Sequence, residues 1–367
     1  MTQDAHFLAH ALRFAARGQG RTWPNPSVGC VLVRDGHVLA AARTGDGGRP
    51  HAETLALAAA GDARGAIAYV SLEPCAHHGA TPPCAKTLID AGVARVVIAA
   101  IDPDPRVAGR GIAMLEAGGI TVLTLPQNEK IINPLRGFFR RVTHGFPEVG
   151  CKLATSLDGR IADAHGVSQW ITGPAARTHG HALRATYDAI VTGIGTVLTD
   201  DAPLTVRLPG ATAHPLRIVC DRRLRLPLTS KLVRSASANP VWIITGAEAV
   251  EHAASHATEL REAGVVLHVV EDETLAPRTI LTTLGAAGLT RVLIEAGPAL
   301  TTAFLGANLV DTLHWYRAPI LLGNTGAAVI SALDTSVNHA PRAVPTERIP
   351  LGPDVYERYE LTACLPD

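Results

Sequence analysis

Short β-rich runs alternate with helical segments along most of this chain, and this alternation constrains the fold more than any other feature. Between Val28 and Leu125 the runs follow one another, with a hairpin turn at Asp35-Gly36 near the beginning. The alternation restarts at Val149. Strands separated by helices of this length favour a layered fold with mostly parallel strands. We therefore expect an α/β protein.

The length and the spacing of the β-rich runs indicate two domains. At roughly 150 residues per domain, a chain of 367 residues is expected to form two domains or slightly more. The segment from Pro126 to Pro147 holds one helical stretch and few β-rich runs, so we place the boundary near Phe146. We expect one domain in residues 1–146 and a second in residues 147–367.

Composition narrows the class of protein and the kind of partner. The chain has 33 Lys and Arg residues against 33 Asp and Glu residues, which argues against a general polyanion binder, because such a protein needs surplus cations to displace counterions. The N-terminal segment carries Asp4, has no basic region, and has no apolar run long enough for a signal peptide or a membrane span. We expect a cytoplasmic protein with small-molecule partners, and neither nucleic acid nor membrane.

One ordered set of residues in the first half has the composition of a catalytic zinc site. His51-Ala52-Glu53 opens a predicted helix, Pro74-Cys75 ends a predicted strand, and Cys84 begins the next helix. One imidazole and two thiolates fill three tetrahedral positions of zinc and leave the fourth for water. Glu53 can take a proton from that water and pass it to a leaving amine. This is the pattern of the zinc nucleobase deaminases, so we predict His51, Cys75 and Cys84 as ligands and Glu53 as a catalytic residue.

Each of these residues taken alone has a plainer interpretation, because a histidine at a helix start and buried cysteines are common structural features. Their order, each at the end of a strand or helix, favours the metal site. We leave His77 and His78 out of the ligand set, since loop histidines are commonly solvated. The other cysteines have no such partners, and we expect reduced thiols at Cys30, Cys151, Cys220 and Cys364.

The loop between the two ligand cysteines carries a specific resemblance. Cytidine and tRNA deaminases have these cysteines close together, as PCxxC, whereas Cys84 follows Cys75 by nine residues here. The longer loop resembles the deaminase domain of the bifunctional riboflavin-biosynthesis enzymes. Other segments share the resemblance, namely Ser71-Leu72-Glu73-Pro74, the run Pro24-Asn25-Pro26-Ser27-Val28-Gly29-Cys30-Val31, Asp102-Pro103-Asp104-Pro105 and Val107-Ala108-Gly109-Arg110-Gly111. The resemblance implies a diaminopyrimidinone ribosylamine phosphate as substrate, with Asn25 lining the pyrimidine pocket.

The second half contains no complete dinucleotide fingerprint. Gly193-Ile194-Gly195 lacks the third glycine that the motif requires, because position 198 is Leu198. A strand ending at Glu295 and followed by Ala296-Gly297-Pro298 leads into a helix from Ala299. The free N–H groups at that helix start can hold a phosphate. Read alone, Gly297 is equally consistent with a simple tight turn.

The same family has a dihydrofolate-reductase-like reductase as its second domain, and this half of the chain is similar to it. The matching segments are Lys152 to Arg160, Ser168 to Thr172, His181 to Arg184, Asp188 to Ile190, Gly193 to Asp201, Leu204 to Arg207 and Glu295 to Pro298. The match runs from about residue 4 to about residue 360. The resemblance therefore implies a cytidine-deaminase-like three-layer α/β/α domain followed by a dihydrofolate-reductase-like α/β domain, with zinc and NADPH as cofactors.

The resemblance also implies the residues of the reductase site. Those expected to contact the nicotinamide cofactor are Ala154, Trp170, Thr196, Asp200, Gly297, Pro298 and Ala299. Those expected to hold the substrate are Ser168, Arg184, Leu204, Arg207 and Glu295. Guanidinium groups bind phosphate bidentately, which suits Arg184 and Arg207 to the substrate phosphate. Arg222, in Asp221-Arg222-Arg223, is a candidate for the 2′-phosphate of NADPH, although arginines often decorate a solvated strand end. Lys152 and Asp200 are candidates for proton handling, with structural ion pairing as the alternative.

Three departures from the family pattern are visible. Ala80 replaces a usual Arg or Lys, Asp104 replaces a common Asn, and the proline of Asp200-Asp201-Ala202-Pro203 is displaced by one position. We expect local differences in substrate contacts at the first two positions and in the bend at the third.

The sequence leaves two rival functions open: a nucleoside or tRNA base deaminase fused to a folate-reductase-like domain, and a folate reductase or silent binding protein without the zinc chemistry. The family resemblance also implies a homo-oligomer.

Overall fold

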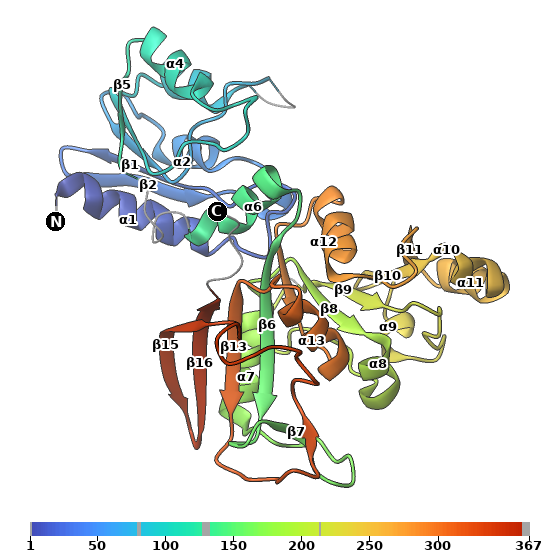
Figure 1. Ribbon diagram of the computed structural model, residues 1–367. Coiled ribbons are helices and arrows are strands. Elements are labelled where there is room, and N and C mark those ends of the chain that lie inside the picture. Colours follow the sequence, from blue (N-terminus) through green and yellow to red (C-terminus); the bar gives the residue numbers. More distant parts are fainter. Residues whose placement is uncertain (1, 79–81, 127–132, 213, 362–367) are drawn as a thin grey trace. The chain divides into compact units, whose positions relative to one another are not determined.

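The chain folds into two compact units, one formed by Met1–Pro147 with Ala287–Thr290 and the other by Glu148–Ala286 with Arg291–Asp367. The computed structural model describes all residues except 1, 79–81, 127–132, 213 and 362–367. Both units are α/β, as the alternation of helical and β-rich segments predicts (Figure 1). None of the helices described combines the length and apolar character that crossing a membrane requires.

The first unit is built on one five-stranded sheet in the described part of the chain, with the order β2-β1-β3-β4-β5. Strand β1 pairs antiparallel with β2 and β3, whereas β3, β4 and β5 are parallel. Its elements are α1 (Gln3–Ala16), β1 (Gly29–Arg34), β2 (His37–Arg43), the 3-10 turn η1 (Asp46–Gly48), α2 (Ala52–Ala60), β3 (Ile67–Val70), α3 (Cys84–Asp90), β4 (Arg95–Ile98), α4 (Arg110–Ala117), β5 (Thr121–Thr124), η2 (Asn133–Leu135) and α6 (Arg136–His144).

Local sequence signals explain where several of these elements begin and end. Asp35 and Gly36 both have positive φ values, 53° and 77°, which is the geometry of the two-residue turn that joins β1 and β2. His51 precedes α2 in an extended conformation, and Gly61 ends that helix with a φ of 70°. The predicted hairpin turn and the predicted helix start are therefore confirmed.

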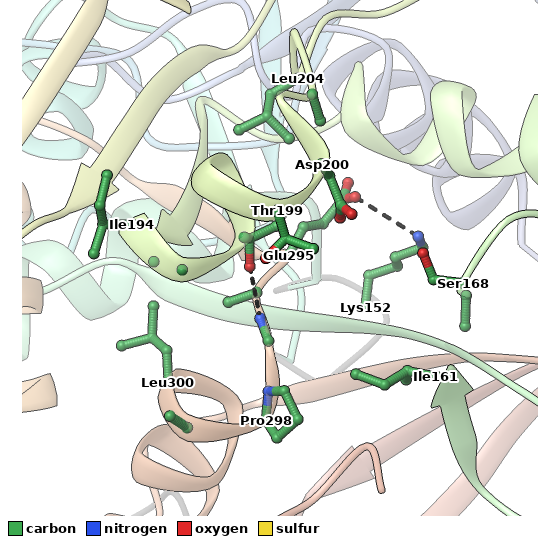
Figure 2. Close-up of a pocket in the computed structure, with 18 of the residues that line it drawn as sticks. Lys152, Ile161, Ser168, Ile194, Thr199, Asp200, Leu204, Glu295, Pro298 and Leu300 are labelled. Atoms are coloured by element: carbon green, nitrogen blue, oxygen red, sulfur yellow. Dashed lines mark hydrogen bonds and ion pairs between the residues drawn. The ribbon is translucent and has the colours of Figure 1, made fainter. Parts of the chain in front are cut away.

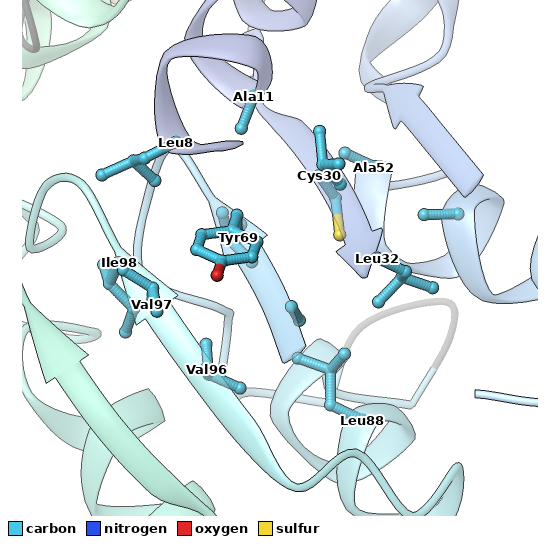
Figure 3. Packing of buried hydrophobic residues seen from close by; sticks show 14 of the residues in the cluster. Leu8, Ala11, Cys30, Leu32, Ala52, Tyr69, Leu88, Val96, Val97 and Ile98 are labelled. Carbon is cyan, nitrogen blue, oxygen red and sulfur yellow. The ribbon is translucent and has the colours of Figure 1, made fainter. Parts of the chain in front are cut away.

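The core of the first unit lies on both faces of its sheet, because residues of either parity on β1 are buried. On one face, Phe7 of α1 contacts the ring of Tyr69 at 5.3 Å between centroids. A Cβ atom at Gly29 would lie 1.9 Å from the carbonyl oxygen of Ala11, so only glycine allows α1 to approach β1 this closely. On the other face, Cys30 packs in the same cluster as Ala52 of α2 (Figure 3). The layers are those of an α/β/α sandwich.

The second unit contains a nine-stranded sheet among the described residues, with the order β11-β10-β9-β8-β12-β6-β13-β16-β15. The strands from β11 to β13 are parallel, and β16 and β15 are antiparallel additions at one edge. A separate pair joins β14 to β7. The elements are β6 (Glu148–Thr155), β7 (Arg160–Ala162), α7 (Pro174–Arg184), β8 (Ala189–Gly193), α8 (Ile194–Asp200), β9 (Leu216–Cys220), α9 (Lys231–Arg234), β10 (Val241–Gly246), α10 (Ala247–His252), α11 (Ala254–Glu262), β11 (Val265–Val270), α12 (Pro277–Ala286), β12 (Arg291–Ile294), α13 (Pro298–Gly306), β13 (Thr312–Arg317), β14 (Ala327–Ala328), β15 (Ala343–Leu351) and β16 (Asp354–Leu361).

The expected restart of the alternation at Val149 and the expected strand ending at Glu295 correspond to β6 and β12, whereas no strand was predicted at β13, β15 or β16. Strand β13 extends the parallel part of the sheet beside β6, and β16 and β15 complete its antiparallel edge. Strand β15 is exposed along most of its length and contains Pro345 and Pro350. Its sequence therefore lacks the alternating apolar pattern of a strand. It also contains prolines, which are rare inside a sheet but tolerated at its edge.

Candidate functional site

The three predicted zinc ligands lie together in the first unit. His51 is the N-cap residue of α2, Cys84 is the first residue of α3, and Cys75 lies between β3 and α3. His51 Nδ1 is 3.2 Å from Cys84 Sγ and 3.7 Å from Cys75 Sγ. Their ligand atoms all lie within 4.8 Å of one another, the one such group of His, Cys, Asp and Glu side chains in the described ranges. One nitrogen and two sulfur donors fit zinc with an open coordination position.

The charges around this cluster suit proton transfer. Glu53 lies in the first turn of α2 and is only 3% exposed. Burial raises the pKa of Glu53 to about 7. Hydrogen bonds from Cys84 and His51 lower the pKa of Cys75 to about 4, which favours the thiolate that a metal requires. The site thus holds a carboxyl group that can exchange a proton near neutral pH next to a metal-binding cluster.

The other residues considered in the first half occupy less direct positions. Asn25 donates a hydrogen bond from its side-chain nitrogen to the carbonyl oxygen of Gly48, at 3.2 Å, and so lies against the segment that leads to His51. His77 and His78 are exposed and do not belong to the cluster. Buried, unpaired thiols occur at Cys30, Cys151 and Cys220, whereas Ala80 and Cys364 lie outside the described residues.

The second unit contains a cavity of about 1180 Å³, and every residue that the sequence predicted for the reductase site lines it. The cavity lies where the parallel strands β6, β8, β9 and β12 end at their carboxyl termini, which is where α/β sheets bind ligands. The predicted residues that line it are Lys152, Ala154, Ser168, Trp170, Arg184, Thr196, Asp200, Leu204, Arg207, Arg222, Glu295, Gly297, Pro298 and Ala299.

A charged cluster occupies one side of this cavity. Nε and Nη2 of Arg184 donate to the two carboxylate oxygens of Glu295, at 2.7 and 2.8 Å. Lys152 Nζ is 3.7 Å from the same carboxylate (Figure 2). Burial opposes ionisation of Glu295, but Arg184 and Lys152 outweigh it and lower the pKa of Glu295 to about 2. Glu295 is therefore a carboxylate at neutral pH, and it holds the two cations in place.

Arg184 lines the cavity, as expected for a residue of the substrate site, but its guanidinium group is paired within the protein. We expected its guanidinium to bind the substrate phosphate bidentately, but that edge is occupied by Glu295, and Nη1 donates to the carbonyl oxygen of Thr205. The physical reason is that the buried Glu295 carboxylate needs a cation to offset its desolvation. Arg207 lines the same cavity and is exposed, so of these two arginines Arg207 is the one that remains accessible to a phosphate.

The turn after β12 is fixed by Thr196. The hydroxyl of Thr196 accepts a hydrogen bond from the Gly297 amide at 3.0 Å. Pro298, which is labelled in Figure 2, begins α13. The Gly193-Ile194-Gly195 segment, which lacks the dinucleotide fingerprint, also lines the cavity as the link between β8 and α8. The two turns face one cavity and provide amide groups at helix starts.

A group of exposed arginines follows strand β9 at the rim of the cavity. The lining includes Arg222, Arg223 and Arg225, together with Lys231. The buried carboxylate of Asp221 accepts hydrogen bonds from the amides of Arg225 and Leu226 and so shapes this turn. Arg222 was expected from the sequence, whereas Arg225, Lys231, Thr274 and Leu275 were not, because no motif in the sequence links these segments to the site.

The bend with the displaced proline is well defined. Asp201 ends α8 with a φ of 41°, and Leu204 has a φ of 51°. Asp200, Ala202, Pro203 and Leu204 all line the cavity. Burial raises the pKa of Asp200. The shifted proline is thus accommodated by residues in the left-handed region on either side of it.

Comparison with known proteins agrees with both halves of this description. Residues 1–100 match the family model of the cytidine and deoxycytidylate deaminase zinc-binding region. Residues 147–347 match the model of the RibD C-terminal domain. The chain is 41% identical to the riboflavin biosynthesis protein RibD of Escherichia coli (strain K12), an alignment that covers 96% of this chain and 98% of that protein.

Solved structures show the same relationship over the whole chain. The structure titled Acinetobacter baumannii RibD, form 2, has a TM-score of 0.87 at 39% identity and covers 98% of this chain and 99% of that one. A diaminohydroxyphosphoribosylaminopyrimidine deaminase/5-amino-6-(5-phosphoribosylamino)uracil reductase from Thermotoga maritima has a TM-score of 0.85 at 31% identity, with the same coverage of 98% and 99%. The fold and the two sites define a bifunctional enzyme, with a deaminase domain of the zinc-binding type and a reductase domain.

The chain belongs to the RibD family of riboflavin biosynthesis proteins. Membership confirms the predicted fold class and the prediction of an enzyme that acts on a small molecule. It also makes the two rival functions unnecessary, because the relatives match along nearly the whole chain rather than in one domain.

Proposed function

We propose that the first domain, residues 1–146, catalyses zinc-dependent hydrolytic deamination of 2,5-diamino-6-ribosylamino-4(3H)-pyrimidinone 5′-phosphate. The second domain, residues 147–367, then reduces the ribosyl group to ribityl with NADPH. The observation that carries the proposal is the pairing of the His51, Cys75 and Cys84 cluster with a separate cavity lined by all the predicted reductase residues. The zinc donor set and the lining of the cavity support one reaction in each domain.

In the deaminase domain, His51, Cys75 and Cys84 would hold zinc, with Glu53 as the proton shuttle. A bound zinc ion supplies a water with its pKa lowered from about 15.7 to about 7, and thus a nucleophile at neutral pH. Glu53 would take the two protons of the attacking water in turn, giving one to the adjacent ring nitrogen of the pyrimidine and the other to the departing amine. Water and the amine are converted to a carbonyl and ammonia, and Glu53 returns to its starting state.

In the reductase domain, the chain would bind the substrate beside the cofactor and supply a proton. NADPH supplies a hydride to C1′ of the ring-opened sugar. The imine nitrogen attached to C1′ gains a proton in the same reduction, and Lys152 is our candidate donor because its ammonium group lies in the cavity, held by the Glu295 carboxylate at 3.7 Å. Asp200 lines the same cavity as the second candidate. Trp170, Ala154 and the turn from Gly297 to Ala299 would contact the cofactor.

The phosphate groups are assigned to the accessible cations. Arg207 would bind the phosphate of the substrate, while Ser168 and Leu204 line the space next to it. Arg222, assisted by Arg225, would bind the 2′-phosphate of NADPH, because planar guanidinium groups match phosphate oxygens bidentately. The cytoplasmic location, the homo-oligomer and the absence of a nucleic-acid or membrane partner belong to the same proposal.

Ammonia release from the diaminopyrimidinone phosphate tests the deaminase assignment. The zinc-loaded chain is expected to release ammonia without NADPH, and removal of zinc by a chelator should abolish the release while zinc readdition restores it. Release that persists in the metal-free protein would overturn the assignment of the zinc site.

A further inference from the structure

The buried carboxylate of Glu73, which is not one of the predicted zinc ligands, connects two segments of the deaminase domain that resemble the family. These segments are Ser71 to Pro74 and Asp102 to Gly111. Glu73 lies two residues before Cys75 and is 4% exposed. Its Oε1 accepts hydrogen bonds from the amides of Gly111 and Ile112, at 2.9 and 3.3 Å. Its Oε2 accepts from the amides of Gly109 and Asp102, at 3.0 and 3.3 Å. Four backbone amides thus share one carboxylate, and three of them belong to the N-terminal turn and N-cap of α4.

The backbone around Glu73 is fastened to the same region. The Glu73 amide donates to the carbonyl oxygen of Ala100 at 2.9 Å. A Cβ atom at Gly111 would lie 1.9 Å from the carbonyl oxygen of Pro74, so α4 touches the chain immediately before Cys75. The segment that leads to Cys75 is therefore held on one side by the loop from residue 100 onward and by the first turn of α4.

The other side of the segment is held by the second cysteine ligand. The amide of Cys84 donates to Cys75 Sγ at 3.3 Å, and the amide of Ala85 donates to the carbonyl oxygen of Cys75 at 3.2 Å. Cys75 thus has its sulfur and its carbonyl oxygen tied to the start of α3. The Glu73 side chain ties the residues just before Cys75 to the first turn of α4. Together, the contacts to α3 and to α4 fix the position of the Cys75 sulfur.

We propose that Glu73 is a positioning residue for the zinc site, which aligns Cys75 with His51 and Cys84 by clamping the Cys75 segment to the first turn of α4. This inference rests on the proposed function, because it presumes that the cluster binds zinc. Groups that orient metal ligands through hydrogen bonds typically change metal affinity or activity about 10- to 100-fold when they are replaced.

The variant Glu73→Gln tests the clamp with little change in size. Each carboxylate oxygen accepts two N–H groups, so a side-chain amide must place its own NH2 group against two donors, whichever way it turns. The control is Asp4→Asn, which alters a different carboxylate of the same domain. Asp4 accepts from the Tyr69 hydroxyl at 2.9 Å and pairs with Arg95 at 2.6 Å, and it fastens α1 to the sheet without touching the Cys75 segment.

Zinc affinity is measured on the full-length chain by competition with a chromophoric chelator. For Glu73→Gln we expect the zinc dissociation constant to rise about 10- to 100-fold, with an unchanged reductase rate on deaminated substrate, while Asp4→Asn binds zinc as the wild type does. An unchanged dissociation constant in Glu73→Gln would overturn the inference and leave the proposed function standing. A wild-type chain without zinc affinity would overturn both.

Hydrogen exchange on the wild-type chain tests the same coupling if Glu73→Gln does not fold. Because coupling between sites is reciprocal, removal of zinc should loosen the clamp and accelerate exchange of the Gly109 and Gly111 amides. The amide of Leu55, which is hydrogen-bonded to the carbonyl oxygen of His51, reports any general loosening of α2 at the site. Unchanged exchange at Gly109 and Gly111 in the metal-free protein would contradict a positioning role for Glu73.

Discussion

Arg184 and Glu295 form a two-pronged ion pair at the wall of the reductase cavity, with Nε and Nη2 at 2.7 and 2.8 Å from the two carboxylate oxygens. The side chains are 14% and 9% exposed. A pair this well enclosed is a structural element as well as a site feature, because removing one partner leaves a desolvated charge without compensation. The sequence suggested that Arg184 and Arg207 both bind the substrate phosphate. In the structure Arg184 pairs with Glu295, and Arg207 remains accessible in the cavity.

Replacing Arg184 and Arg207 one at a time separates these roles. Arg184→Ala leaves Glu295 buried without its main cation and is expected to lower the free energy of unfolding of the second domain by about 3–5 kcal/mol. Arg207→Ala should leave that free energy unchanged and raise the KM of the reductase for the phosphorylated substrate. Denaturant unfolding and steady-state kinetics provide the two measurements. Equal losses of stability in both variants would contradict the assignment.

Glu53→Gln removes the proposed proton shuttle and leaves the three proposed zinc ligands in place. We expect kcat for ammonia release to fall about 10²- to 10⁴-fold, the usual contribution of a positioned general acid or base. Zinc content, measured by metal analysis, should remain that of the wild type. The internal control is NADPH oxidation with already deaminated substrate, which should not change. Deamination at the wild-type rate would exclude Glu53 from the chemistry.

The ion pairs of Glu295 predict a pH dependence of stability. Its pKa is lowered from 4.5 to about 2, so the folded state binds fewer protons than the unfolded state in this range. The stabilisation by Glu295 is fully present above pH 4.5 and is lost as the pH falls towards 2. We expect the difference in free energy of unfolding between wild type and Glu295→Gln to be constant above pH 4.5 and to shrink as the pH falls from 4.5 towards 2. A difference that grows on acidification would have the wrong sign.

Arg222 is expected to discriminate between NADPH and NADH. Arg222→Ala removes a cation from the cavity rim and should weaken NADPH binding by about 1.5–3 kcal/mol, the usual value for hydrogen bonds to a charged group. NADH has no 2′-phosphate and its KM should not change. Arg234→Ala, an exposed arginine of α9 outside the cavity lining, serves as the control. Parallel losses for both cofactors would place the 2′-phosphate elsewhere.

Sequence patterns predicted those parts of the molecule in which neighbouring residues determine the geometry. The Asp35-Gly36 turn adopts the positive φ values that its residues favour, and His51 is the N-cap of α2, where the helical pattern begins. The grouping of the three predicted zinc ligands was also predictable in part: His51 and Cys84 stand at helix starts, as expected, whereas Cys75 lies in the connection between β3 and α3 rather than at the end of the strand. The family resemblance added the residues of the reductase cavity, which composition and periodicity alone do not indicate.

Contacts between distant residues could not be predicted in the same way. Arg184 and Glu295 are 111 positions apart, and only the folded sheet shows that one neutralises the other. The four amides around Glu73 come from residues about 30 to 40 positions further along, and backbone donors leave no trace in a sequence. Strand β15 was missed because an exposed edge strand needs no apolar alternation.

The assignment of one reaction to each domain is tested most directly by giving the full-length enzyme the diaminopyrimidinone ribosylamine phosphate. Ammonia release and NADPH oxidation are then measured separately. We expect ammonia to appear without NADPH. NADPH oxidation should require the deaminated product, so a metal-depleted enzyme should reduce that product but not the original substrate. Ammonia release that depends on NADPH, or reduction of the deaminated product that is lost with zinc, would contradict an enzyme with one reaction in each domain.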